Sequence, residues 1–335
     1  MRSTSGAVLL LAGMLAMLPV GCQSIQQHRA TVHAQQGIMA LDAGKLDQAR
    51  WEFQQAANND PKFAFAYRKM GDIQTMQGEH AAAADSYNAA LKASPYDTDI
   101  ALRLGQAYRY VGRLAEAARA FLYACDIEPT SFKANFELAN CYLQMGQPQK
   151  AQEYYNRAIE IDPNSAEAFQ NLAVAQEAGG DLDVAIRSYL QSIEQNPIET
   201  NILLNLAACH LRQGKPHLAQ QALQRALLIN DTNPTIHRQL AYCLFLQKKY
   251  EPAEMHYRRA IELGKDPQAH AGIGVVMMMR YLAQQEPRDM SLRNRAIQHW
   301  QRSLELEPNQ PKLIALVAKY AQVSINDKAV SQTVP

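Results

Sequence analysis

Apolar residues recur along this chain at helical spacing, in short segments separated by glycine or proline. In residues 132–165, a first apolar face is followed by Gly146, and a second begins near Pro148 and ends before Pro163. The two faces consist of Leu138, Ala139 and Tyr142, and of Ala151, Tyr155 and Ala158. Spacings of three and four residues place such side chains on one side of a helix. Proline fits the first turn of a helix, and a proline further along the chain ends a helix. The pattern therefore predicts two helices joined by a tight turn.

This pattern returns every 34 residues, in three independent positions. The small residue of the second helix recurs as Ala49, Ala83, Ala117, Ala151, Ala185, Ala219 and Ala253. The turn glycine recurs as Gly44, Gly78, Gly112, Gly146, Gly180 and Gly214. The closing proline recurs as Pro61, Pro95, Pro129, Pro163 and Pro197. A large apolar position accompanies them as Phe53, Tyr87, Phe121, Tyr155, Tyr189, Leu223 and Tyr257. A fixed period of this length predicts stacked structural repeats.

These residues resemble the tetratricopeptide repeat over residues 30 to about 310. The resemblance implies an all-α solenoid, a right-handed superhelix of helix-turn-helix units whose first helices line a concave groove. The small residues allow close approach of helices, the large apolar residue fills the gap between units, and the glycine supplies a turn with positive φ. A single hairpin cannot bury its apolar face alone, so the stack is the stable form.

The repeats define the organisation of the chain. Seven regular repeats are expected over residues 30–267, and an irregular eighth over 268–310 has its second helix nine residues late. The extra length is expected in a polar loop at residues 284–292, which is either a partner contact or a tolerated surface insertion. Residues 311–323 predict a capping helix with Leu313, Leu316, Val317 and Tyr320 on one side, before a flexible tail at 324–335.

The N-terminus has the pattern of an export signal. Arg2 precedes an apolar run too short to span a bilayer comfortably, so residues 1–21 are expected to be a signal peptide and 22–29 a short polar linker. Gly21-Cys22 resembles the lipobox of bacterial lipoproteins, with Pro19 where an aliphatic residue is usual. The resemblance implies cleavage before Cys22 and lipidation of its thiol. Gln23, the residue after this cysteine, resembles what lipoproteins sorted to the outer membrane carry at that position. Plain secretion, an uncleaved anchor and a chance apolar start remain alternatives.

Composition narrows the functional class. The net charge is +1, with 33 basic and 32 acidic residues interspersed, so neither nucleic acid nor an anionic surface is an expected partner. The nine histidines show no paired ligand spacing, and no nucleophile elbow, phosphate loop or dinucleotide fingerprint occurs. We therefore expect no enzyme activity, no metal, no cofactor and no small-molecule substrate.

Four cysteines besides Cys22 need an explanation in an exported protein. Cys141, Cys209 and Cys243 share one repeat position inside a first helix, which predicts small core residues. Cys125 lies on a second helix and could approach Cys141, but spacing alone does not determine a disulfide. His210 occupies a core position and is expected to be packed there. The methionines of residues 275–279 are interpreted as core.

The remaining candidate for function is the surface of the first helices. Carried over in register from the family, the partner-binding groove would include Arg68, Lys69, Arg103, Gln106, Arg109, Tyr110, Phe136, Asn140, Gln170, Asn171, Asn205, Arg238, Gln239 and Tyr242. Repeats two and three would make it basic, and repeats four to six would contribute asparagines and apolar groups. Arginine pairs with carboxylates, and asparagine can donate to and accept from a peptide backbone. The family's carboxylate clamp is not predicted, because Phe136, Asn140, Asn171, Asn201 and Asn205 lack its basic residues.

The sequence thus predicts a non-enzymatic scaffold of a bacterial envelope, tethered by lipid to the periplasmic side of a membrane, the outer membrane favoured. Its partners would be proteins or peptides docked in the groove. By architecture it resembles lipoproteins that serve pilus or secretion assembly and adaptors of envelope enzymes. A regulatory subunit of an envelope enzyme and a soluble cytoplasmic adaptor are the alternatives.

Overall fold

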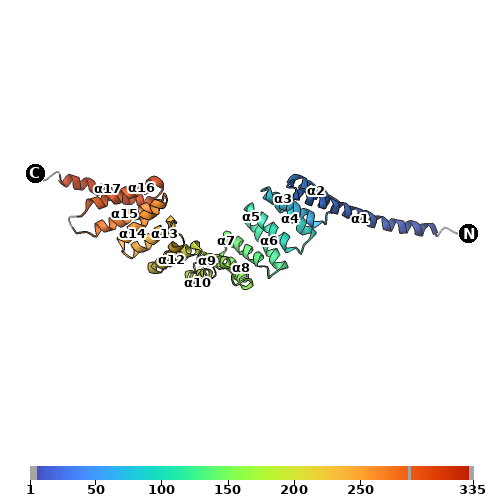
Figure 1. Cartoon of the computed structure of the whole chain (residues 1–335), viewed down its shortest axis with the longest axis horizontal. Coiled ribbons are helices and arrows are strands. Elements are labelled where there is room, and N and C mark those ends of the chain that lie inside the picture. Colours follow the sequence, from blue (N-terminus) through green and yellow to red (C-terminus); the bar gives the residue numbers. More distant parts are fainter. Residues whose placement is uncertain (1–5, 286–287, 332–335) are drawn as a thin grey trace. The chain divides into compact units, whose positions relative to one another are not determined.

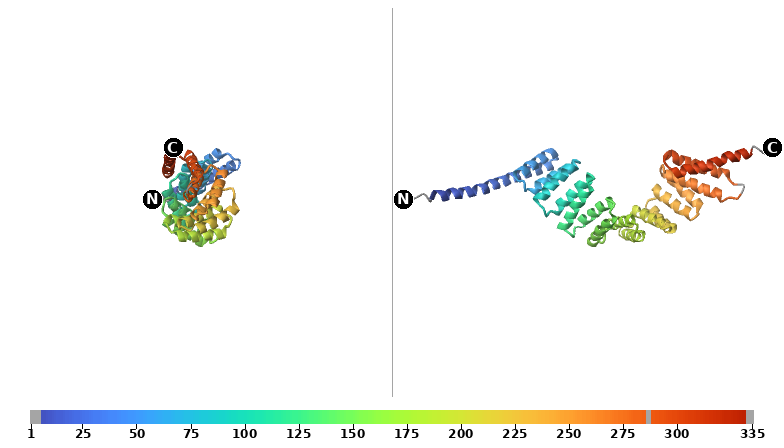
Figure 2. Two further views of the ribbon diagram at one scale, coloured as in Figure 1. Left: turned by 90° about the vertical axis from the view of Figure 1, so that its left-hand side faces the viewer. Right: turned by 180° about the vertical axis from the view of Figure 1, so that it is seen from behind.

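Hairpins of helices account for the structure of this chain. The computed structural model describes the backbone of residues 6–285 and 288–331, and the side chains of 24–285 and 288–321. These described residues contain helices and no strand. They divide into two compact units, one up to Asn164 and one from Ser165 onward, called unit 1 and unit 2. Figure 1 shows the hairpins of each unit in succession, and Figure 2 shows them from two further directions. The predicted all-α repeat fold is confirmed.

Unit 1 contains four hairpins. Its helices are α1 (Gly6–Asp42), α2 (Leu46–Asn59), α3 (Ala64–Met76), α4 (His80–Ala93), α5 (Thr98–Tyr110), α6 (Leu114–Ile127), α7 (Phe132–Gln144) and α8 (Pro148–Ile161). The two helices of each hairpin pack together, and α2, α4 and α6 also pack on the first helix of the next hairpin. Each apolar face is thereby covered by a neighbour, as the repeat pattern requires.

Unit 2 continues the same order. Its helices are α9 (Ala166–Gly179), α10 (Leu182–Gln195), α11 (Thr200–Arg212), α12 (Pro216–Ile229), α13 (Pro234–Leu246), α14 (Tyr250–Leu263), α15 (Pro267–Leu282), α16 (Met290–Leu306) and α17 (Pro311–Ser331). One apolar core runs through the unit, from Ala173 on α9 to Leu313 on α17. Leu316, Val317 and Tyr320 of α17 pack partly buried against this core, so one side of α17 covers the end of the core.

The turn inside each of the first seven hairpins contains a left-handed residue. The six turn glycines have φ between 68° and 93°, a region in which a side chain is strained. In the seventh hairpin Lys248 stands at this position with φ 59°, the one non-glycine residue with positive φ among the described residues. The turn geometry is therefore kept even where its preferred residue is missing.

The large apolar residue of each second helix lies directly on the small residue of the first. All seven, from Phe53 to Tyr257, are buried. A Cβ placed on Gly71 would lie 2.6 Å from Cε1 of Tyr87, and one on Gly105 equally close to Phe121. Such distances are below van der Waals contact, so these hairpins need glycine where others have alanine.

The structure departs from the sequence-based description at both ends. α1 continues through residues 22–29, which were expected to form a linker, and the side chain of Cys22 lies outside the described residues. α17 likewise continues to Ser331 through most of the expected flexible tail. The predicted loop at 284–292 is shorter than expected, because α16 begins at Met290 and buries Leu292. The eighth hairpin instead has longer helices, 16 and 17 residues against 13 and 14 in the seventh.

Candidate docking surfaces

The fourteen candidate residues all lie on first helices. In unit 1 they belong to α3, α5 and α7, and in unit 2 to α9, α11 and α13. We call these two sets of first-helix residues the unit 1 face and the unit 2 face.

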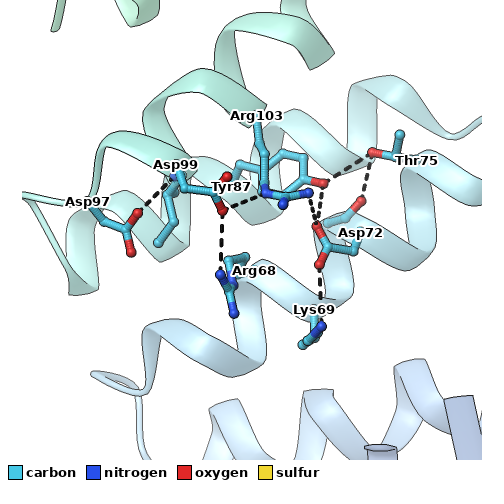
Figure 3. Close-up of polar contacts among 10 residues, drawn as sticks. Arg68, Lys69, Asp72, Thr75, Tyr87, Asp97, Asp99 and Arg103 are labelled. Atoms are coloured by element: carbon cyan, nitrogen blue, oxygen red, sulfur yellow. Dashed lines mark hydrogen bonds and ion pairs between the residues drawn. The ribbon is translucent and has the colours of Figure 1, made fainter. Parts of the chain in front are cut away.

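A network of charged side chains joins α3 and α5 on the unit 1 face (Figure 3). The Arg103 guanidinium donates from Nε to Asp99 Oδ2 at 2.7 Å and from Nη1 to Asp72 Oδ1 at 3.1 Å. Arg68 Nη1 reaches Asp99 Oδ2 at 3.4 Å, and Lys69 Nζ lies 3.8 Å from Asp72 Oδ2. Arg103 is therefore held by two carboxylates, one on its own helix and one on the previous first helix.

The protonation states in this network follow from its contacts. The hydrogen bond that Arg103 donates to Asp99 is the largest cause that raises the pKa of Arg103 above its usual value. Burial acts to raise the pKa of Asp99, but the hydrogen bond and charge of Arg103, with the charge of Arg68, hold it below its usual value. Tyr87 donates its hydroxyl to Asp72 Oδ1 at 2.9 Å, and burial raises the pKa of Tyr87 to about 12. Asp99 is thus an ionised acceptor near neutral pH.

Carboxylates neutralise most of the positive charge of the section that was expected to be basic. Three cations, Arg68, Lys69 and Arg103, share the surface with Asp72 and Asp99, which leaves a local surplus of one positive charge. The surplus lies on the Lys69 side, where the ion pair is longest. Spacings of three and four residues from the cations could have indicated both aspartates in the sequence.

The other candidates on the unit 1 face are largely occupied by neighbours. Arg109 pairs with Glu137 of α7 at 3.0 Å. Asn140 Oδ1 accepts a 2.6 Å hydrogen bond from the Tyr155 hydroxyl. Phe136 is 9% exposed and packs on Phe132 and Tyr155, so it serves the core more than a partner.

Tyr110 is the open exception on this face. The residue is 65% exposed, and its ring stacks on His80 at a centroid distance of 4.5 Å. A rigid aromatic ring supported from behind offers contact area at low entropic cost.

The unit 2 face is defined by a row of carboxamides. Asn171, Asn205 and Gln239 follow one another at 34-residue intervals on α9, α11 and α13, and all three are half-buried. Gln239 Oε1 is buried and has no hydrogen-bond partner among the described residues. Half-buried Gln170, Val174 and Leu204 and the exposed Tyr242 lie on the same helices. Carboxamides both donate and accept, so one row can match the alternating groups of an extended backbone.

Ion pairs neutralise the charges beside this row. Arg212 donates to Glu177 at 2.6 Å, and Glu177 also accepts from the Tyr189 hydroxyl at 3.2 Å. Burial is the largest cause that raises the pKa of Tyr189, which keeps it a neutral donor. Arg238 pairs with Asp266 at 2.9 Å and donates to Gln268. The unit 2 face is therefore polar without a net charged centre.

The buried thiols and the histidine behave as core groups. Cys141, Cys209 and Cys243 are fully buried, as their shared position predicted, and Cys125 is buried too. All four are free thiols, so Cys125 and Cys141 do not form the disulfide considered above. Burial raises the pKa of Cys125 and Cys141 to about 11 and of Cys209 and Cys243 to about 12. His210 is half-buried, and burial lowers its pKa.

The described part of the chain contains neither a metal-binding cluster nor a helix suited to cross a membrane. There, no three or more His, Cys, Asp or Glu side chains are placed to hold a metal ion. No helix within those residues combines the length and the apolar character needed to cross a membrane.

Helical hairpins of 34 residues with this turn and ring geometry define a helical-repeat protein. Models of the tetratricopeptide repeat match residues 35–98, 132–165, 154–187 and 199–266. The chain belongs to the tetratricopeptide repeat family. No curated protein sequence matches it.

Solved structures give the same fold. A Pseudomonas aeruginosa protein, PilF, has a TM-score of 0.53 at 20% identity, over 66% of this chain and 97% of PilF. A tetratricopeptide repeat protein from Parabacteroides merdae has a TM-score of 0.51 at 16% identity, over 81% of this chain and 99% of that one. A chain of the Cut9–Hcn1 hetero-tetramer of the APC/C has a TM-score of 0.51 at 18% identity, over 82% of this chain and 52% of that one. At these identities the likeness concerns the fold alone.

Proposed function

We propose that this protein is a non-catalytic scaffold that docks segments of partner proteins on its two first-helix faces. The carboxamide row of Asn171, Asn205 and Gln239 carries the proposal most directly. It places donor and acceptor groups at regular intervals, with a buried oxygen of Gln239 that has no partner of its own. A backbone N–H of an extended peptide would donate to the Gln239 oxygen, and half-buried Val174 and Leu204 would contact the apolar side chains of that peptide.

The unit 1 face would bind a different kind of partner segment. Its surplus of one positive charge beside Lys69, and the exposed ring of Tyr110, suit a segment with a carboxylate and an apolar side chain. Arg68 Cζ and Lys69 Nζ each lie 5.6 Å from the centroid of the Phe65 ring. This cation–π contact restrains both side chains. The two faces would thus hold two kinds of segment.

Site-specific photocrosslinking in cells tests this function. A photoreactive residue would replace Gln106 on the unit 1 face and Asn205 on the unit 2 face. Matched controls would replace the exposed Arg119 and Arg187 on the second helices α6 and α10. Defined adducts at the first-helix positions and none at the controls are expected. Equal labelling at all four positions would refute docking on these faces.

We further propose that Cys22 carries lipid and tethers the scaffold to the periplasmic side of a bacterial membrane, in an envelope assembly such as a pilus or secretion complex. The lipobox-like Gly21-Cys22 and the apolar run before it support this proposal. Two or more acyl chains would hold the protein stably at a bilayer. Because the backbone of α1 continues past Cys22 into the first hairpin, unit 1 would then lie near the bilayer.

Fatty-acid labelling of wild type and Cys22→Ala, each followed by membrane fractionation, tests the tether. Label and membrane residence that both vanish in the variant are expected. Wild type that carries no label and stays in the cytosol would refute the tether and favour a soluble adaptor. Co-purification of an active envelope enzyme would instead favour a regulatory subunit.

A further inference from the structure

Two pairs of histidines lie in the last two hairpins of unit 2, α13–α14 and α15–α16. His237 on α13 and His256 on α14 face each other with their Nδ1 atoms 3.1 Å apart and their rings 29° from parallel. His270 on α15 and His299 on α16 repeat this contact, also at 3.1 Å between Nδ1 atoms. Each pair joins the two helices of one hairpin.

The hydrogen bonds of the first pair specify its protons. His237 Nε2 lies 3.0 Å from the carbonyl oxygen of Asp231, which can only accept, so Nε2 carries a hydrogen. In the neutral ring Nδ1 is then bare and accepts the Nδ1–H of His256. A single hydrogen fits between the two nitrogens. When both rings are protonated, two N–H groups and two positive charges oppose each other.

The groups around His256, His270 and His299 favour the neutral forms of these three rings. Burial, followed by the charge of His237, lowers the pKa of His256. Burial also lowers the pKa of His270, helped by Arg302 and opposed by Asp266. For His299, burial, His270, Arg258 and Arg295 outweigh Glu254 and lower the pKa to about 4.

The first hairpin of the chain carries the opposite chemistry at the same repeat positions. His33 and Glu52 precede His237 and His256 by six repeats, and both pairs are 19 residues apart. His33 Nδ1 lies 2.8 Å from Glu52 Oε2. Protonation of His33 turns this contact into an ion pair, whereas protonation of both rings at the equivalent positions of unit 2 creates repulsion.

We infer that unit 2 is an acid-sensitive module: mild acidification loosens its last two hairpins and the adjoining part of the unit 2 face, while the first hairpin of unit 1 keeps its pair. The regulatory meaning rests on the proposed docking function, since loosening would release a segment held by Gln239 and Tyr242 on α13. The structural response itself needs no partner.

Proton linkage explains why acid destabilises the folded state of these hairpins. Histidines whose folded pKa is depressed stabilise the folded state above their unfolded value of 6.5, and acid removes this contribution as the pH falls toward the folded value. For His299, values of about 4 and 6.5 would multiply the unfolding constant by about 30-fold at pH 5.0, and solvent screening of a half-buried ring reduces this to about tenfold.

Hydrogen exchange of the full chain at pH 7.5 and 5.0, with a chelator present and rates corrected for intrinsic exchange, tests the inference. Protection in α13–α16 is expected to fall about tenfold or more at pH 5.0, while protection in α1 and α2 holds. His256→Glu copies the His33–Glu52 pair and should remove most of the acid loss in α13 and α14. Glu52→His, its mirror variant, should make α1 and α2 acid-sensitive.

The outcomes are distinct. Equal acid loss in wild type and His256→Glu, or no loss in wild type, would overturn the inference. Should His256→Glu be unfolded at pH 7.5, His256→Gln replaces it, because a neutral amide can donate to His237 and cannot titrate. Hydrogen exchange is measured without a partner. Failed crosslinking on the first-helix faces would therefore refute the docking function and leave the acid-sensitivity result unchanged.

Discussion

At the scale of single residues, Lys248 occupies a backbone conformation that belongs to glycine. Its φ of 59° matches the turn glycines of the other hairpins, and its Cβ is strained there. We expect Lys248→Gly to raise the free energy of unfolding by about 0.5–1 kcal/mol, because relief of strain exceeds the added flexibility of the unfolded chain. Urea unfolding measures the change. Gly214→Ala, the matched control one repeat earlier, should lower the same quantity by about 1 kcal/mol.

The contact between Gly71 and Tyr87 gives a second prediction at this scale. Gly71→Ala would bring a methyl group to 2.6 Å from the ring, and we expect a loss of about 1–3 kcal/mol. Repeat six pairs Ala207 with Leu223 at the same positions, both buried. Tyr87→Leu should therefore make Gly71→Ala nearly harmless. A double-mutant cycle by urea unfolding tests this coupling, and additive effects would contradict the packing explanation.

At the scale of elements, the cap α17 stabilises unit 2 through one side of its helix. Leu313 is 6% exposed in the core, whereas its neighbour Ile314 is 50% exposed. We expect Leu313→Ala to cost about 2–3 kcal/mol because it leaves a cavity. Ile314→Ala, of similar size and on the same helix, should change stability by less than about 0.5 kcal/mol. Thermal unfolding compares the two, and equal losses would show that α17 does not bury the predicted side.

The elements themselves were largely predictable from the sequence, for a physical reason. Gly44 and its equivalents require a turn, and Ala49 and its equivalents require close packing, so the repeated residues indicate both helices of each hairpin. The contacts between neighbouring first helices were not predictable in this way. Asp72 reaches Arg103, and Asp99 reaches Arg68, only when two repeats are stacked. Phe136 is buried only because Phe132 and Tyr155 surround it. Such contacts differ from repeat to repeat and leave no periodic signal.

At the scale of the whole molecule, the two units contain separate apolar cores. The core of unit 2 begins at Ala173, and the clusters of unit 1 end at Cys141. In a repeat stack each hairpin depends mainly on its neighbours, so damage spreads over short distances. Gly71→Ala should therefore lower hydrogen-exchange protection in α3–α6 and leave α11–α16 unchanged. Leu313→Ala should do the reverse, lowering protection in α15 and α16 while α1–α6 keep theirs.

This last prediction separates two ways of working for a scaffold with two faces. If both variants lowered protection throughout the chain, the units would unfold as one, and acid loosening of unit 2 would also release a segment bound to unit 1. If each effect stays within its unit, the Arg103 network and the carboxamide row keep or lose their segments independently. The second outcome is expected, because the described contacts that hold each face, Arg103 with Asp72 and Arg212 with Glu177, lie within one unit.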